Sequence, residues 1–216
     1  MTEHAFEDMR RSMVASQLRT TGVNDPGVLA AMGAVPRERF VPADRISTAY
    51  ADALVPLKFG RDLNSPMALG KLLSEARPVW GERALVVGAA TGYSAAVLAH
   101  MVGALVALEE DEDLAALARK ALAGTPVKLV SGPLAGGCKK SAPYDLILVD
   151  GAIETVPKAL IGQLAEGGRL AAALIEDGVT RLCIGRKAGD GFGIHAFSDA
   201  AAAILPGFEK PRAFTF

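Results

Sequence analysis

The residues of this chain best suited to chemistry lie in a turn of small residues and at the acidic end of a later apolar run. Gly88 to Gly92 separates the apolar run 84–87 from a segment with helical spacing, and Glu109 lies 21 residues after Gly88. Glycines at a strand-to-helix turn let an anion approach the backbone, and an acidic residue about 20 residues later commonly binds ribose hydroxyls. The pattern therefore predicts a nucleotide-type cofactor site.

Each of these residues also has a purely structural interpretation, which stays open at this point. The glycines would then only shape a tight turn, and Glu109 would be a solvated strand end. Asp150 ends another apolar run, and ligands in open α/β sheets bind at the carboxyl ends of the strands. It either contacts a ligand there or caps the turn that follows.

A mainly parallel sheet is needed to bring these residues together. Apolar runs alternate with helical segments from residue 83 on, as in a sheet covered on both faces. We predict strands at 84–87, 104–108, 127–130, 144–150, 169–175, 181–186 and 193–197. We predict helices at 94–101, 113–122 and 158–164, and a hairpin turn at 187–192.

The first 80 residues are helical in character, and we expect them to form an extension packed on the α/β core, residues 81–216. Asp25-Pro26 and Ser65-Pro66 are helix starts, with a capping side chain before a proline in the first turn. Gly33 is placed to end the first of these helices. With 216 residues, the chain is predicted to form a single domain.

A segment of 25 residues between Arg83 and Glu109 carries no Asp, Glu, Lys or Arg, which suggests either a membrane span or a buried centre. Its three glycines and its polar residues favour strand, turn, helix and strand. The formal net charge of −1 argues against nucleic acid or an anionic membrane as partner. The acidic N-terminus lacks a secretion signal and Cys138 and Cys183 lack metal-ligand spacing, so we expect a cytoplasmic protein without a metal.

A longer set of motifs separates the cofactor classes that the turn leaves open, a nicotinamide dinucleotide and S-adenosylmethionine. These motifs resemble the protein-L-isoaspartate O-methyltransferase family over most of the chain. They include Gln17-Leu18, Gly22-Val23, Val35-Pro36-Arg37-Glu38, Phe40-Val41-Pro42, Ala49-Tyr50, Gly92-Tyr93, Pro143-Tyr144-Asp145 and Gly167-Gly168-Arg169-Leu170.

The resemblance implies the class I methyltransferase fold, a mainly parallel seven-stranded α/β sheet with an antiparallel last strand, and it implies that the N-terminal extension lies on the substrate side of the core. It also implies S-adenosylmethionine as cofactor and the carboxylate of an isoaspartyl residue in a protein or peptide as methyl acceptor. The implied cofactor residues are Gly88, Ala89, Ala90, Gly92, Glu109, Glu110 and Leu134. The implied substrate residues are Arg61, Leu63, Ser65 and Asp150, with Asp62 and Asn64 at the catalytic positions.

This chain departs from the family pattern at those same places. The family's substrate turn reads Gly-Gln-Thr-Ile-Ser-Gln-Pro, whereas residues 60–66 read Gly-Arg-Asp-Leu-Asn-Ser-Pro. If Asp62 faces the acceptor carboxylate, it would repel it unless Arg61 turns inward. Alternatively, Asp62 points to solvent or caps the next helix. Val86, Ala90 and Pro133 replace a carboxylate, a glycine and an aspartate of the cofactor site.

Three alternatives to isoaspartyl methylation follow from the pattern. The first is the same fold with a different methyl acceptor, since Asp62, Asn64 and Asp150 would line a pocket suited to a neutral or cationic group. The second is a non-catalytic relative with a degenerate site, motivated by Val86, Ala90 and Pro133. The third is a nicotinamide oxidoreductase, which the turn permits and the N-terminal motifs disfavour.

Overall fold

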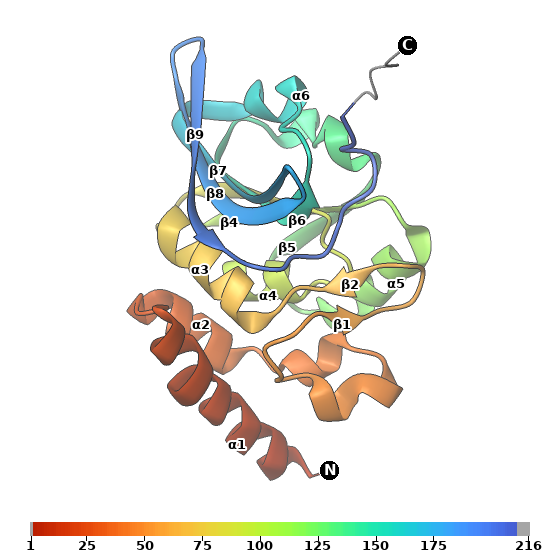
Figure 1. Ribbon diagram of the computed structural model, residues 1–216. Helices are drawn as coiled ribbons and strands as arrows, with labels where there is room; N and C mark the ends of the chain where they lie inside the picture. The colour runs from red at the N-terminus through yellow and green to blue at the C-terminus, as the bar shows by residue number, and fades with distance from the viewer. Residues whose placement is uncertain (1, 211–216) are drawn as a thin grey trace, which may run out of the picture.

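The centre of the protein is a seven-stranded sheet, seen in a computed structural model that describes residues 2–210 (Figure 1). The strand order is β5-β4-β3-β6-β7-β8-β9. The strands are β3 (Arg83–Val87), β4 (Ala104–Glu109), β5 (Val127–Ser131), β6 (Tyr144–Ile153), β7 (Leu164–Glu176), β8 (Val179–Ala188) and β9 (Gly191–Asp199). The first five pair in parallel, and β8 and β9 each pair antiparallel with the strand before them. The predicted fold is confirmed.

The parallel register places the candidate residues at one edge of the sheet. Val87 of β3 is paired with Leu108 of β4 on one side and with Val149 of β6 on the other. Gly88, Glu109 and Asp150 are each the next residue along those strands. Three positions that are far apart in the sequence therefore meet at the carboxyl ends of adjacent strands, as ligand-binding residues do in this class of sheet.

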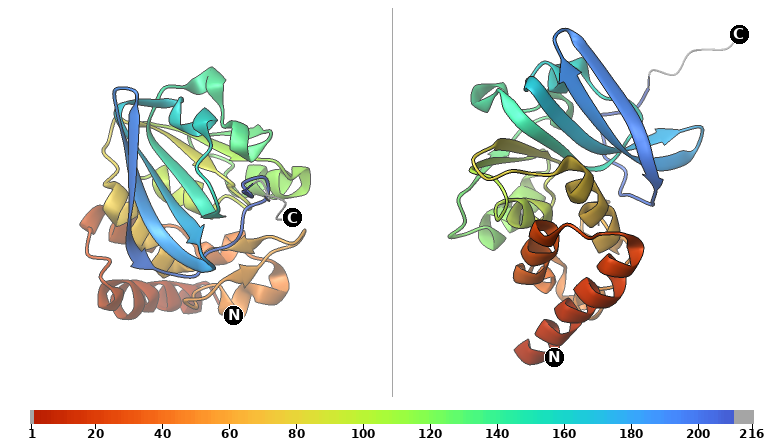
Figure 2. Two further views of the ribbon diagram at one scale, coloured as in Figure 1. Left: turned by 45° about the horizontal axis from the view of Figure 1, so that its top comes forward. Right: turned by 90° about the vertical axis from the view of Figure 1, so that its left-hand side faces the viewer.

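The two faces of the sheet are covered unequally (Figure 2). The larger core cluster joins one face to α2 (Pro26–Ala34), α3 (Pro66–Ala76), α4 (Tyr93–Leu98) and part of α5 (Glu112–Ala121). The other face packs on short 3₁₀ turns at Leu134–Gly136 and Lys139–Ser141 and on the four-residue helix α6 (Lys158–Ile161). Leu205 and Phe208, which follow the last strand, complete this thin second layer.

The N-terminal residues form a layer of helices outside α3 and α4. It consists of α1 (Glu3–Ser12), a π-helical stretch (Met13–Leu18), 3₁₀ turns at Arg19–Thr21, Arg37–Phe40 and Ala43–Thr48, and α2. Asp25 Oδ1 accepts from Val28 N, and Ser65 Oγ accepts from Ala68 N. Both predicted helix starts are therefore confirmed. The first of these helices ends at Ala34, one residue beyond the predicted Gly33.

Two segments cross the carboxyl edge of the sheet. One is a small hairpin of β1 (Val55–Pro56) and β2 (Asp62–Leu63). The other, here called the C-terminal segment, is residues 200–210, which run from the end of β9 back across the molecule past β2 (Figure 1). It forms an isolated parallel bridge between Ile204 and Ala152, beyond the last regular pairs of β6 with β3.

The charge-free segment is strand, turn, helix and strand, and the expected buried centre is confirmed by β3, α4 and β4. No helix within residues 2–210 is long and apolar enough to cross a membrane. The helix predicted at 158–164 ends at Ile161, because Gln163 already pairs through its carbonyl with Tyr144 N and β7 starts at Leu164. The single tryptophan, Trp80, is 76% exposed in the loop before β3.

Candidate functional site

The turn after β3, together with Glu109, is called the corner below. Gly88 and Gly92 both have positive φ angles, as a tight strand-to-helix turn requires, and Ala90 adopts φ +49° despite its side chain. The N–H groups of Gly88 and Ala89 both donate to Leu108 O, and that of Gly92 donates to Ala89 O. These amides are thus already bonded within the chain, whereas an anion-binding turn offers free N–H groups to its ligand.

Glu109 is the best-satisfied group of the corner. It is fully buried, and its carboxylate accepts N–H groups from Ala90 at 2.6 Å, Glu110 at 3.0 Å and Asp111 at 3.1 Å. Arg61 reaches in from the hairpin and donates to Glu109 Oε1 at 3.0 Å and Oε2 at 3.4 Å. The expected ribose carboxylate is therefore held by a buried counter-charge of the chain itself.

Asn64 links the other two elements of this edge. Its Nδ2 donates to Asp150 Oδ1 at 2.7 Å, and its Oδ1 accepts from Ala203 N at 2.8 Å. Asp150 is thus bonded to the turn 60–66 rather than capping the turn after its own strand. Asn64, Asp150 and the C-terminal segment form one buried hydrogen-bonded unit.

Leu205 fills the space directly above Gly88. A β-carbon added to Gly88 would lie 2.9 Å from Leu205 Cδ2 and 3.4 Å from Arg61 Nη2. A β-carbon added to Gly151 would lie 2.5 Å from Leu205 Cγ. The segment is fixed by Ala152 N donating to Ala203 O at 2.6 Å and Leu205 N donating to Ala152 O at 3.0 Å. With its side chain only 2% exposed, Leu205 packs where the glycines leave room.

A second buried arginine, Arg37, contacts the backbone of Ala49 and of Asn64. Arg37 is fully buried and donates from Nε to Ala49 O and from Nη2 to Asn64 O, both at 2.6 Å. Its guanidinium lies 4.5 Å from the centre of the Tyr93 ring, a cation–π distance. Arg37 and Arg61 balance the formal charges of Asp150 and Glu109, so the buried cluster is neutral without any ligand.

Burial raises the pKa of the Asp150 carboxyl above its usual value, and the hydrogen bond from Asn64 and the charges of Arg37 and Arg61 offset this only in part. A carboxyl with a raised folded-state pKa lowers stability as the pH rises from the unfolded-state pKa through the folded-state pKa. Asp150→Asn keeps the oxygen that accepts from Asn64 and removes the charge. We expect it to raise the melting temperature at pH 8 and to have no effect near pH 4.

Thermal unfolding of the wild type and Asp150→Asn across this pH range measures the difference directly. Asp190→Asn, at an exposed turn, is the matched control and should change the melting temperature equally at both pH values. A gain for Asp150→Asn that stays constant down to pH 4 would contradict the expected titration of Asp150.

The remaining predicted site residues are spread over several environments. Asp62 is half-buried in β2 and does not cap α3, because Ser65 is the cap. Leu63 and Leu134 are buried in the two core clusters, and Ala89 is buried within the turn of the corner. Glu110 is exposed and accepts weakly from Leu134 N at 3.5 Å. Their assignment to a substrate or cofactor stays a prediction.

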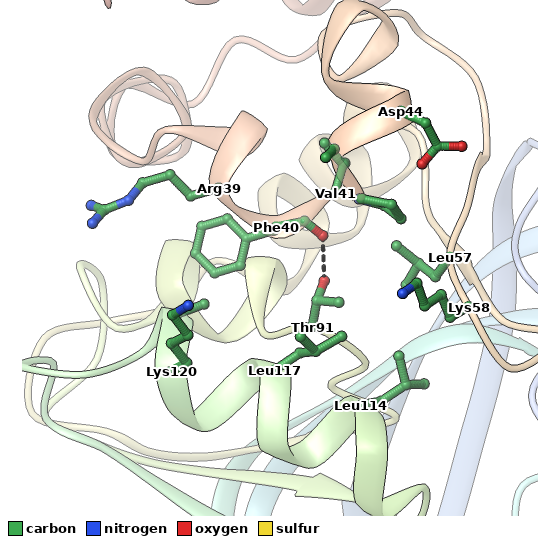
Figure 3. Close-up of a pocket in the computed structure, with 13 residues that line it drawn as sticks. Arg39, Phe40, Val41, Asp44, Leu57, Lys58, Thr91, Leu114, Leu117 and Lys120 are labelled. Carbon is green, nitrogen blue, oxygen red and sulfur yellow. Dashed lines mark hydrogen bonds between the residues drawn. The ribbon is translucent and has the colours of Figure 1, made fainter.

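A cavity borders the corner at Thr91 (Figure 3). It has a volume of about 690 Å³ and is lined by Thr91 but not by Gly88, Glu109 or Asp150. Its floor is apolar, with Leu57 and Leu114, and Thr91 Oγ1 donates to Phe40 O along one wall. The sidewall cations are Arg39, Lys58 and Lys120. This cavity therefore adjoins the corner at Thr91 and does not extend to Gly88, Glu109 or Asp150.

Sequence reasoning missed the residues that fill the corner from the C-terminal segment. Ile204-Leu205 and Phe208 stand near the end of the chain as apolar residues flanked by small or polar ones, which is the one signal that could have pointed to them. It also left open whether Arg61 turns inward, and the structure shows that it does.

Comparison with known proteins identifies the relatives of this arrangement. A sequence profile of the protein-L-isoaspartate(D-aspartate) O-methyltransferase family matches residues 9–198. The chain belongs to this family. A protein-L-isoaspartate O-methyltransferase of Methylorubrum populi is 43% identical over 163 residues, covering 74% of this chain and 77% of the relative. A protein-L-isoaspartate O-methyltransferase 2 of Marinobacter nauticus is 39% identical over 212 residues, covering 94% and 95%.

The solved structures agree on the fold of this isoaspartate methyltransferase family member. A Plasmodium falciparum structure described as a putative protein-L-isoaspartate O-methyltransferase in complex with S-adenosyl-L-homocysteine has a TM-score of 0.75. It is 19% identical and covers 89% of this chain and 96% of its own, so it bears on the fold alone. The family resemblance seen in the sequence is confirmed by the profile and by the curated relatives.

Proposed function

We propose that this protein is an S-adenosylmethionine-dependent carboxyl methyltransferase that acts on isoaspartyl residues in proteins or peptides. The family match over residues 9–198 carries this proposal. The sheet supports it, because β3, β4 and β6 bring Gly88, Glu109 and Asp150 to one carboxyl edge. Methyl transfer converts the isoaspartyl carboxylate into a methyl ester and S-adenosylmethionine into S-adenosylhomocysteine. The backbone nitrogen of the following residue can then attack the ester carbonyl, methanol leaves, and water reopens the resulting succinimide in part as normal aspartate. We place this repair of damaged proteins in the cytoplasm.

S-adenosylmethionine is the cofactor that membership in this family indicates, but the described conformation does not accommodate it at the corner. Leu205 and Arg61 occupy the space over Gly88, and both oxygens of Glu109 have partners in the chain. An acceptor carboxylate is already ionised at neutral pH and needs no base, so residues near it act by positioning it.

The proposed activity predicts transfer of a labelled methyl group from S-adenosylmethionine to an isoaspartyl peptide and none to the same peptide with normal aspartate. The second peptide is the control, because it has the same sequence and charge and differs only in the position of the backbone bond. Base-labile methyl ester on the isoaspartyl peptide is the readout. Absence of ester at high enzyme and cofactor concentrations would contradict the proposal.

One observation favours a second candidate, a non-catalytic relative. The cluster of Arg37, Arg61, Asp150 and Glu109 neutralises itself within the fold. A protein that keeps this fold only for stability or for a protein partner would bind neither S-adenosylmethionine nor S-adenosylhomocysteine. Calorimetric titration with both compounds separates the candidates, because micromolar affinity excludes the second.

A further inference from the structure

The space over Gly88 is occupied by two side chains that come from opposite directions in the sequence. Arg61 comes from the hairpin and Leu205 from the C-terminal segment, and both lie within 3.4 Å of a β-carbon built on Gly88. Arg61 is 6% exposed and Leu205 is 2% exposed. Gly88 would let a cofactor approach the backbone, but in this structure it is covered by Leu205 and Arg61.

The attachments of these two side chains differ from those of the core beneath them. Leu205 belongs to a segment held at the edge by two backbone hydrogen bonds with Ala152 and one from Ala203 N to Asn64. Ile204, one residue earlier, is 70% exposed. The segment buries Ala203, Leu205 and Phe208, but its pairing with the sheet is a single isolated bridge to β6 at Ala152, so it can leave the edge without breaking the regular strand pairs. Such surface elements are the parts of a protein that open at low free-energy cost.

We propose that Leu205 and Arg61 form a displaceable plug in the corner, so that the cofactor affinity of this chain is set by the equilibrium between the plugged and open corner. The inference rests on the proposed function, because it takes S-adenosylmethionine as the molecule that competes with the plug. When only a small fraction of the protein is open, the measured dissociation constant is the intrinsic constant divided by that fraction.

The experiment is a calorimetric titration of the purified wild type and variants with S-adenosylhomocysteine. It is run well below the melting temperature of each protein. Leu205→Ala and the milder Leu205→Val shorten the plug, and Arg61→Gln frees Glu109. We expect Leu205→Ala and Arg61→Gln each to tighten binding by about tenfold or more relative to the wild type. The matched controls are Ile204→Ala, on the exposed neighbour of Leu205, and Arg45→Gln, on an exposed arginine, which should stay within about twofold.

A second readout follows the plug itself. Amide hydrogen exchange at Leu205 and Ala152 reports the two hydrogen bonds that fix the segment. We expect saturating S-adenosylhomocysteine to speed exchange at both amides in the wild-type protein. This readout does not depend on methyl transfer, and it holds even if Leu205→Ala unfolds, because it uses the unmodified chain.

Three outcomes overturn the plug. The first is wild-type affinity equal to that of the plug variants, and the second is saturation of the protein while both amides stay protected. The third is no binding by any variant. In the first two cases an intact isoaspartyl methylation assay leaves the proposed function standing. In the third case the methylation assay is also negative, and the proposed function falls with the plug.

Discussion

Replacing Arg61 with methionine is expected to lower the free energy of unfolding by about 3 to 5 kcal/mol. The substitution leaves Glu109, which is fully buried, with three backbone N–H donors and without a counter-charge. Breaking a buried pair by removing one partner is costly because the remaining charge stays out of water. Urea denaturation with an unchanged slope measures the loss.

A second change tests the cause of that loss. Arg61→Met combined with Glu109→Gln removes both charges, and the glutamine carbonyl still accepts from a backbone N–H such as that of Ala90. We expect the double variant to recover most of the lost stability. Arg45→Met, on an exposed arginine 3.5 Å from Asp44, should change stability by less than about 1 kcal/mol. A double variant no more stable than Arg61→Met would show that packing of the arginine, rather than charge, stabilises the corner.

The second large effect is expected at Arg169, which ties the end of α3 and the loop before β3 to the sheet. Its Nη1 and Nη2 each donate to Glu82 at 2.8 Å, and it also donates to the carbonyls of Arg77, Ala76 and Asp145. Arg169→Ala strands these acceptors in a largely buried place and is expected to cost about 3 to 5 kcal/mol. Chemical denaturation of the variant checks this loss.

The control for Arg169 is its cross-strand partner. Arg186 is paired with Arg169 in the sheet and is exposed, so Arg186→Ala should be near neutral. Arg169→Lys should recover less than half of the loss, since an ammonium cannot reproduce the planar fork of a guanidinium. Full rescue by lysine would contradict the geometric argument.

The same variant bears on domain organisation. We propose that residues 1–80 and the core 81–216 unfold as one domain, because the larger core cluster contains residues of both. Arg169→Ala should then lower the midpoint of a single unfolding transition. Far-ultraviolet circular dichroism and urea-gradient electrophoresis should give the same midpoint. Two separated transitions would instead assign the N-terminal layer its own stability.

Most of the local structure could be predicted because it depends on short sequence patterns. Ser65 before Pro66 specifies a capped helix, and an apolar run such as 146–149 specifies a buried parallel strand. The position of Glu109 after its strand placed it correctly at the corner. These features depend on residues within a few positions of one another, so a single sequence carries them.

The filling of the corner could not be predicted in the same way. Arg61 and Glu109 are 48 residues apart, and Asn64 and Ala203 are 139 apart. Nothing in the turn 60–66 says whether its arginine faces solvent or a carboxylate, because both are compatible with the local backbone. Leu205 is recognised only once the sheet shows which edge the C-terminal segment crosses.

The position of Trp80 decides whether intrinsic fluorescence can report on the corner. Trp80 precedes the amino end of β3, whereas the corner follows its carboxyl end, and the five residues of β3 span roughly 16 Å. Its exposed indole is expected to emit at the long wavelengths typical of tryptophan in water. This emission should not change when the space over Gly88 opens or closes. Ile204→Trp in a Trp80→Phe background would place a single fluorophore beside Leu205, and stopped-flow fluorescence would then time the departure of the segment.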